Sequence, residues 1–502
     1  MFNLIEKKFE DLENKSITEN GAVGYKSTGS ALLDLNYSVS SLRQASQDEI
    51  IRLFNSAFDE DKVYAMKWLF FARDVRGGLG ERRLFRICYQ RLLDLDIDYF
   101  MKNLVNISEF GRWDDLVYLL GISSVTDERI ITIIKSQLKQ DLYNYQNNNN
   151  ISLLAKWLPS ENASNVHTKR FAKKVRKLLK LPSKEYRKML SLLRKYLDVV
   201  EVKMCSNEWE DIDYNKVPSL ANLKYRNAFL KHDKFRRLEY LDDLCNNKAK
   251  MNMNVATPVD IVSNYCNNWY SVKEYDKTLE LAWDNLKDIS VSDTLVVADS
   301  SGSMTVPVSR TNTALEVANA LAIYTSEHNS SVYKNKYITF SNTPQFVKFD
   351  DDDSLKEKLE ICLNHSEVAN TNIEAVFRLI LDVAIENELS NDDMIKNILI
   401  ISDMEFDMAQ RGWGRNENVL TKPLFESIWE DYANAGYLLP KLIFWNVNSR
   451  TKTIPLIEND LGVTLVSGFS QNILKMVMSD KYDPYEVLKE QLDSERYDSI
   501  FT

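Results

Sequence analysis

The amino-acid sequence predicts a protein of two parts: an α-helical, HEAT-like α-solenoid in the amino-terminal half and a doubly wound α/β domain in the carboxy-terminal half. Its 502 residues exceed what one hydrophobic core usually holds. Residues 1–288 carry apolar side chains at helical spacing in one stretch after another. Residues 289–485 alternate short apolar runs with helical patterns, which is typical of a sheet covered by helices. We therefore expect domains at residues 1–288 and 289–485, and a charged peripheral tail at residues 486–502.

The overall composition is that of a folded protein without a membrane segment. Hydrophobic residues make up 44% of the chain, and no run of eighteen apolar residues occurs. Residues 1–15 include several acids and lack the apolar core of a signal peptide. The five cysteines are far apart, and the four histidines show no metal-ligand spacing. We expect a cytoplasmic protein with reduced, mostly buried thiols and no membrane partner.

Two predicted helices in the amino-terminal half flank a glycine-rich turn. Apolar spacing predicts helices at residues 61–73 and 81–95, and three glycines lie between them. This turn is not a Walker loop, because no Gly-Lys-Ser/Thr ends it. Two interpretations stay open: a structural corner with salt bridges, or a phosphate site formed by the arginines of the corner. These arginines are Arg73, Arg76, Arg82 and Arg83.

Further helical patterns cover residues 107–120 and 128–145, and the polar residues 146–150 predict a loop. Repeated helix pairs of this kind suggest an α-solenoid, although no strict sequence period marks it.

A basic stretch at residues 169–195 contains a single acid, Glu185, in a chain whose net charge is −10. Helical spacing places its cations and its apolar residues on opposite faces of two helices, with a break at Pro182. Nucleic-acid backbone binding is the interpretation we favour. A solvated or protein-facing surface and a membrane-binding surface are the alternatives. The predicted binding residues are Lys169, Lys173, Lys174, Arg176, Lys177, Lys180, Arg187, Lys188, Arg194 and Lys195.

A second basic group, at residues 224–237, is interleaved with Tyr225, Phe229 and Phe235. Aromatic side chains can stack on bases, which favours single strands. At helical spacing they can equally belong to the hydrophobic core.

The carboxy-terminal half alternates strand and helix patterns. We expect strands at 294–298, 336–340, 398–402, 441–447 and 463–466, with an antiparallel candidate at 345–349. Helices are expected at 313–327, 354–363, 373–385, 419–435 and 471–478, and a linker helix within 272–292. The acidic run at 350–353 is explained better as the start of a helix than as a cation site.

A carboxylate and two hydroxyls follow the first of these strands. Asp299, Ser301 and Ser303 come directly after the apolar run, where open α/β sheets bind their ligands. Mg²⁺ prefers oxygen ligands and keeps several waters, so one carboxylate and two hydroxyls on a tight loop suit it. The alternative is an ordinary cap of the next helix, since Ser and Asp favour caps.

This Asp-x-Ser-x-Ser spacing resembles the metal-ion-dependent adhesion site (MIDAS) of von Willebrand factor A (vWA) domains. That family adds a threonine from a second loop and an aspartate from a third, and Thr371 and Asp403 stand at matching positions. Glu405 departs from the family, which usually has a small residue there, so its charge either tunes the metal or faces solvent. The resemblance implies a Mg²⁺ or other divalent-cation site with one place open for an acidic group of a protein partner. Its metal residues are Asp299, Ser301, Ser303, Thr371 and Asp403.

The combination of a helical half and this second domain resembles the Ro (TROVE) ribonucleoprotein family, and more closely an uncharacterised sister family with the same plan. The resembling stretches are residues 20–35, 73–83, 110–115, 156–160, 185–195 and the metal loops. Ro proteins close their helical repeats into a ring that binds small structured and misfolded RNAs, and they are not catalytic. The resemblance implies a non-catalytic ribonucleoprotein scaffold that binds small structured or single-stranded RNA.

A protein-interaction adaptor that uses the metal site without RNA is the alternative function. Metal-dependent phosphoester hydrolysis is a third, and it would require two metals or a general base beside Asp299 and Asp403.

Overall fold

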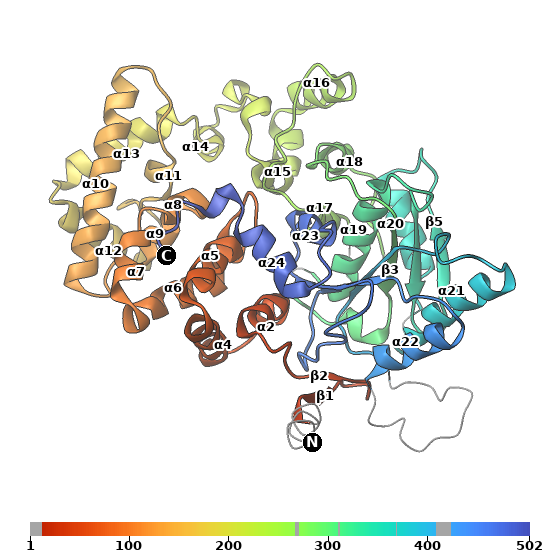
Figure 1. Cartoon of the computed structure of the whole chain (residues 1–502). Helices are drawn as coiled ribbons and strands as arrows, with labels where there is room; N and C mark the ends of the chain where they lie inside the picture. Colours follow the sequence, from red (N-terminus) through yellow and green to blue (C-terminus); the bar gives the residue numbers. More distant parts are fainter. Residues whose placement is uncertain (1–12, 267–270, 310–311, 368, 408–422) are drawn as a thin grey trace. The chain divides into compact units, whose positions relative to one another are not determined.

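A computed structural model describes residues 13–266, 271–309, 312–367, 369–407 and 423–502 of the chain (Figure 1). The backbone contacts divide the chain into two compact units. Unit 1 joins Met1–Trp68 with Met253–Glu495, and unit 2 joins Leu69–Asn252 with Arg496–Thr502. This division differs from the boundary at residue 288 that the sequence suggested, because the amino-terminal segment packs with the α/β part of the chain.

Unit 1 is built around a six-stranded mixed sheet with the order β5-β4-β3-β6-β7-β8. Neighbouring strands are parallel except β5, which is antiparallel to β4. The chain runs outward from β3 to β5, returns to β6 beside β3, and runs outward again to β8. The winding therefore reverses between β3 and β6, the position where open α/β sheets bind ligands. The strands are β3 (Thr294–Asp299), β4 (Lys336–Phe340), β5 (Gln345–Lys348), β6 (Asn397–Ser402), β7 (Lys441–Asn446) and β8 (Val463–Ser467).

The apolar runs of the sequence form this sheet because both of its faces are covered. Every residue of β3, β7 and β8 is buried. A capping box between Thr313 and Glu316 begins the central helix α19, which packs against β3 and β6. The helices of this part are α17 (Pro258–Tyr265), α18 (Lys277–Asp284), α19 (Ala314–Glu327), α20 (Leu355–Asn364), α21 (Glu374–Glu386), α22 (Leu424–Asn434), α23 (Leu474–Val477) and α24 (Pro484–Leu492).

The expected helices and strands of this half are largely confirmed, with three differences. Residues 419–422 of one expected helix lie outside the described residues, and α22 begins at Leu424. The linker at 272–292 is helical only in α18. The tail is not peripheral, because Val487, Leu488 and Leu492 of α24 are buried. The acidic run at 350–353 precedes α20, which begins with a Ser354 cap.

Among its described residues, the amino-terminal segment of unit 1 contains a hairpin that is followed by helices. The hairpin pairs β1 (Lys15–Ile17) with β2 (Val23–Tyr25), and α2 (Ala31–Tyr37), α3 (Val39–Leu42) and α4 (Gln47–Glu60) follow. Helix α2 packs on β8. The Ser40 hydroxyl lies 2.8 Å from that of Ser467 and donates to the Asn446 carbonyl at 3.0 Å, so α3 is joined to the strand ends of the sheet.

Unit 2 is helical. Helix α5 (Lys62–Arg73) runs from unit 1 into it. The others are α6 (Arg82–Leu95), α7 (Ile97–Asn103), α8 (Ile107–Phe110), α9 (Trp113–Tyr118), α10 (Ser124–Gln146), α11 (Leu154–Trp157), α12 (Val166–Leu179), α13 (Ser183–Tyr196), α14 (Val200–Cys205), α15 (Ser219–His232) and α16 (Lys234–Cys245). The single helix expected at 107–120 is two, α8 and α9, because the chain turns at Gly111. A side chain there would meet Asp115 Oδ2 at 2.8 Å.

The five cysteines are all free, as expected, but Cys205 and Cys245 are exposed, so burial of the thiols is only partial. No helix in the described part of the chain is long and apolar enough to cross a membrane.

Candidate functional site

Two buried carboxylates lie at the carboxyl edge of the sheet, on adjacent parallel strands. Asp299 is the last residue of β3, and Asp403 directly follows β6. The register Ala298↔Ile401 brings the two strand ends to the same edge. Asp299 is 1% exposed and Asp403 0%. The winding of the sheet therefore places both carboxylates at its reversal point, as the sequence predicted.

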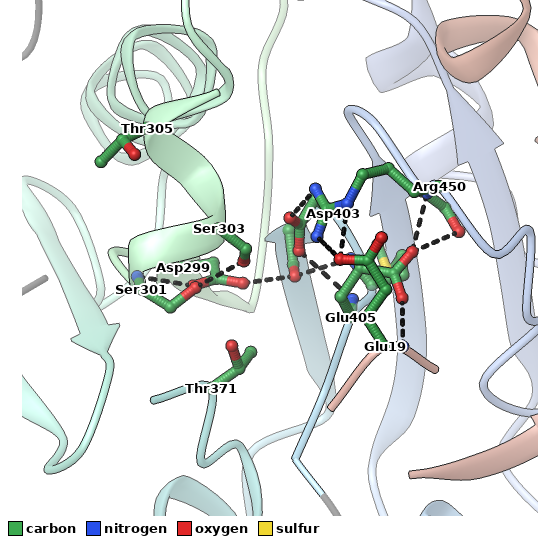
Figure 2. A network of polar contacts seen from close by, with 12 residues as sticks. Glu19, Asp299, Ser301, Ser303, Thr305, Thr371, Asp403, Glu405 and Arg450 are labelled. Carbon is green, nitrogen blue, oxygen red and sulfur yellow. Dashed lines mark hydrogen bonds and ion pairs between the residues drawn. The ribbon is translucent and has the colours of Figure 1, made fainter. Parts of the chain in front are cut away.

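The loop after β3 presents its hydroxyls to these carboxylates (Figure 2). The Ser301 and Ser303 hydroxyls lie 3.1 Å apart. Asp299 accepts the backbone N–H of Ser301 at 2.9 Å. Thr371, from the loop before α21, turns its hydroxyl toward Asp299 and Ser301. The five residues predicted to bind a metal thus lie at the same edge of the sheet (Figure 2).

The environment of this cluster disfavours ionisation of both carboxylates at the same time. Burial, and then the charge of Asp403, raises the pKa of Asp299 to about 7. Burial also raises the pKa of Asp403, and the guanidinium of Arg450 opposes that rise. Arg450 balances the charge of Asp403, and a proton or a cation at Asp299 would balance the second carboxylate. Oxygen donors of this kind, carboxylate and hydroxyl, suit a hard divalent cation.

Clusters of three or more His, Cys, Asp or Glu side chains suited to a metal ion do not occur among the described residues. The site would therefore hold an ion with only two carboxylates and would rely on hydroxyls for the remaining protein ligands.

Arg450 and Glu19 form an ion-paired chain at the edge of the site (Figure 2). Arg450 Nη1 lies 2.9 Å from Asp403 Oδ2, and the same guanidinium lies 2.8 Å from the Glu19 carboxylate. Sequence reasoning missed both residues, because one belongs to the loop after β7 and the other to the amino-terminal hairpin. Neither stands in a motif that marks it.

Glu405 joins the hairpin to the loop after β7, and is neither a solvent-facing charge nor grouped with the metal hydroxyls. Its side chain is fully buried. Its carboxylate accepts the backbone N–H groups of Glu19, Arg450 and Thr451 at 2.7–2.9 Å. The solvent-facing alternative for Glu405 is therefore wrong, and the alternative that its charge tunes the metal stays a prediction.

Asn20 links the hairpin to a predicted metal residue. Its Nδ2 donates to the Glu405 carbonyl at 2.6 Å and to the Thr371 hydroxyl at 3.2 Å. Because the carbonyl can only accept, the orientation of the amide is determined. Asn20 therefore holds the Thr371 hydroxyl in place from outside the cluster.

The basic stretch forms helices α12 and α13 in unit 2, and both pack against α10. Ala172, Val175 and Leu179 of α12 are buried, as are Tyr186, Leu190 and Leu193 of α13. Most of the predicted binding residues are exposed: Lys173, Lys174, Lys177, Lys180, Arg187, Lys188 and Lys195. We refer to these seven residues as the α12–α13 surface.

Three predicted residues are half-buried and do not belong to this surface: Lys169, Arg176 and Arg194. Arg194 donates to the Ala155 and Leu158 carbonyls at 2.8 and 2.6 Å, and burial lowers its pKa. Arg176 pairs with Glu161 at 2.9 Å. The two guanidiniums hold the helices to the preceding loop, a use that helical spacing alone does not reveal.

The glycine-rich corner is a salt-bridged structure. Arg73 is 1% exposed and donates to Asp115 Oδ2 at 2.9 and 2.7 Å. Arg86 donates to Asp115 Oδ1 at 2.7 Å, and Arg82 contacts Asp114 and Asp115. These contacts favour the structural interpretation of the corner over a phosphate site.

Two family models match the chain, and both are described as domains of unknown function. DUF2828 matches residues 18–135 and 163–293, and DUF7788 matches residues 293–499. The uncharacterised protein L728 of Acanthamoeba polyphaga mimivirus is 31% identical over 532 residues. This alignment covers 98% of the present chain and 89% of the mimivirus protein.

Proposed function

We propose that this chain, which belongs to the same family as the mimivirus protein L728, is a non-catalytic RNA-binding scaffold of the cytoplasm. Its ligand is small structured or single-stranded RNA, whose phosphates lie on the α12–α13 surface. The α/β part of unit 1 is then a vWA domain, and the helices of unit 2 are a HEAT-like α-solenoid. The strand order and the Asp-Ser-Ser loop support the first assignment. The succession of packed helices supports the second.

The observation that carries this proposal is the lack of balancing charge on the α12–α13 surface. In the part of the chain that the structure describes, Lys173, Lys174, Lys177 and Lys188 have no carboxylate within ion-pair distance. An ordinary solvated surface mixes both signs of charge. Here a chain of net charge −10 gathers one sign on two helices, which favours a polyanionic ligand.

The test is the salt dependence of RNA binding. Labelled single-stranded and hairpin RNA are titrated with the full chain over a salt series, beside a variant with Lys173, Lys174, Lys177 and Lys188 changed to Glu. The control changes four exposed lysines elsewhere to Glu, so that net charge is matched: Lys135, Lys139, Lys348 and Lys475.

For single-stranded RNA, each phosphate contact contributes about −0.7 to the slope of log affinity against log salt concentration. Four lost contacts therefore lower the slope by roughly three in the first variant, and the control keeps the wild-type slope. Failure of the wild type to bind at low salt, or equal losses in both variants, would refute the proposal.

A divalent cation fits the cluster around Asp299 and Asp403, because buried carboxylates that repel one another gain from a positive charge between them. Asp299, Ser301, Ser303, Thr371 and Asp403 would hold it. When bound, the ion supplies a positive centre with an open place for a carboxylate of a partner.

A protein-interaction adaptor is the second candidate function, and Arg450 favours it. This guanidinium already binds a carboxylate, that of Glu19, directly beside Asp403. An acidic side chain of a partner has the same chemistry. Phosphoester hydrolysis is not proposed, because the extra carboxylate, Glu405, is held by backbone N–H groups and is not free to act as a general base.

A further inference from the structure

A single phenylalanine stands out on the surface of unit 2. Phe235 is 87% exposed, more than any other large hydrophobic residue in the described part of the chain. It is the second residue of α16, at the corner where α15 ends with His232. Burial of a phenylalanine side chain normally stabilises a fold, so nothing in the packing of unit 2 explains why this ring lies in water.

The neighbouring aromatic residue of the same basic stretch behaves differently. Phe229 is 0% exposed and packs edge-on against Tyr214, with ring centroids 5.3 Å apart. The sequence left two interpretations open for these aromatic residues, base stacking and membership of the hydrophobic core, and each of them applies to a different residue. Phe229 belongs to the core, and Phe235 is available to a ligand.

The corner around Phe235 is positively charged. Lys231, His232 and Lys234 are exposed, and neither lysine has an ion pair within the described residues. The one acid between them, Asp233, is neutralised: it accepts from the Tyr214 hydroxyl and from Arg236, both at 2.9 Å. Neither lysine is therefore ion-paired in the described part of the chain, while exposed Glu208, Glu210 and Asp211 lie next to Trp209, whose indole contacts His232.

A further flat ring lies at the same corner. The imidazole of His232 is stacked on the indole of Trp209, with centroids 4.6 Å apart and an interplanar angle of 9°. Two exposed rings and two unpaired lysines therefore occur within five consecutive residues of the chain, 231–235.

We propose that this corner, formed by Lys231, His232, Lys234 and Phe235, binds an unpaired nucleotide of single-stranded RNA. The base stacks on the Phe235 ring, and the flanking phosphates lie near Lys231 and Lys234. Exposed aromatics beside cations are the usual means of binding single strands, because every base has a face that can stack. A protein partner fits less well, because lysine is depleted in the centres of protein interfaces. The inference rests on the RNA-binding function proposed above and adds a second contact in unit 2.

The test compares a single-stranded oligonucleotide with a duplex of the same length and the full chain. Phe235→Leu removes the ring and keeps an apolar side chain, whereas Phe235→Trp keeps a stacking surface. Tyr143→Leu is the matched control, because Tyr143 is an exposed aromatic (60%) on α10 of the same unit. Thermal unfolding of each variant checks that the fold is retained, and we expect no change for a side chain this exposed.

Loss of one stacked base corresponds to a loss of about tenfold in affinity, within the range known for such contacts. We expect Phe235→Leu to bind the single strand about tenfold more weakly, with the same salt slope and with unchanged affinity for the duplex. Phe235→Trp is expected to restore binding, and Tyr143→Leu to resemble the wild type.

Two results would overturn the inference and leave the proposed function standing. The first is that wild type binds RNA and Phe235→Leu binds the single strand equally well, which would assign the ring to a protein partner. The second is an equal loss for single strand and duplex. If the wild type binds neither RNA, both the inference and the proposed function are refuted.

Discussion

Asp115 is the residue on which the arginine corner of unit 2 depends. It is buried, and it accepts hydrogen bonds from Arg73 and Arg86. Burial alone would raise its pKa, but the charges of Arg73 and Arg86 outweigh this effect and hold the pKa of Asp115 below its usual value. The folded state therefore prefers the ionised carboxylate.

We predict that Asp115→Asn lowers the free energy of unfolding by about 3–5 kcal/mol, because it leaves the buried Arg73 guanidinium without a charge partner. Since the folded pKa lies below the unfolded value, the contribution of Asp115 is complete above about pH 4 and is lost as the pH falls through the folded pKa. Urea unfolding of wild type and variant from about pH 7 to about pH 3 measures both effects. The variant is less stable at neutral pH, and it lacks the decrease in unfolding free energy that protonation of Asp115 causes in the wild type.

Asp94→Asn is the control for Asp115. Asp94 pairs with Arg91 at 2.8 Å, but its side chain is 71% exposed, so its replacement costs less than about 1 kcal/mol. Similar losses in the two variants would show that the corner does not depend on the buried carboxylate.

At the scale of elements, Glu405 attaches the β1–β2 hairpin to the sheet edge. We predict that Glu405→Gln weakens this attachment by about 1.5–3 kcal/mol. The reason is that the backbone N–H groups now donate to both carboxylate oxygens, and the NH₂ group that replaces one of these oxygens cannot accept a hydrogen bond. Hydrogen exchange of residues 18–25 would become faster, while exchange in β3 and β6 is retained.

Glu19→Gln provides the comparison for this prediction. It keeps the Glu19 backbone N–H that bonds to Glu405 and removes only the half-exposed ion pair to Arg450. Its effect on exchange of the hairpin should be small. If Glu19→Gln loosens the hairpin as much as Glu405→Gln does, the ion pair and not the buried carboxylate holds it.

Strands and helices with local signals were predictable, and elements held by distant contacts were not. The strands β3 and β6 are continuous apolar runs, and both faces of the sheet are covered, so the sequence marks them clearly. The break at Gly111 has no such signal. It depends on the close approach of Asp115, which a helical pattern across residues 107–120 does not reveal.

The same distinction applies to the candidate sites. Asp299, Ser301 and Ser303 lie together in the chain, and the strand ends bring Asp403 to them, so their proximity follows from the predicted sheet. Arg450 and Asn20 reach this site from segments far away in sequence. On α12 and α13, helical spacing identified the exposed lysines but did not separate them from Arg176 and Arg194, whose partners lie in a neighbouring loop.

At the scale of the whole molecule, the domain boundary was the least predictable feature. Residues 31–37 form helix α2, most of whose residues are buried. Its buried residues, including Leu32, Leu35 and Tyr37, belong to unit 1, where α2 packs on β8. Local periodicity shows that a helix has an apolar face but not which part of the chain covers that face.

The residues proposed for RNA and those proposed for the cation lie in different units, and this separation yields a prediction for the intact chain. The α12–α13 surface belongs to unit 2, and Asp299 and Asp403 belong to unit 1. A cation that binds only the folded protein raises the unfolding temperature progressively with its concentration. We predict that Mg²⁺ stabilises the wild type in this way and that Asp299→Ala abolishes the effect. The exposed Asp352→Ala control, in the acidic run before α20, should retain it.

The two ligands should also act independently. Asp299→Ala is expected to bind RNA with the wild-type salt slope, and the variant with four reversed lysines on α12 and α13 is expected to keep its stabilisation by Mg²⁺. Thermal scans with and without Mg²⁺, together with RNA titrations of the same preparations, measure both quantities. If millimolar Mg²⁺ does not stabilise the wild type, the proposed cation site is wrong. A loss of RNA affinity in Asp299→Ala would show instead that the two units are coupled, because linkage between two ligands is reciprocal and RNA would then also strengthen binding of the cation.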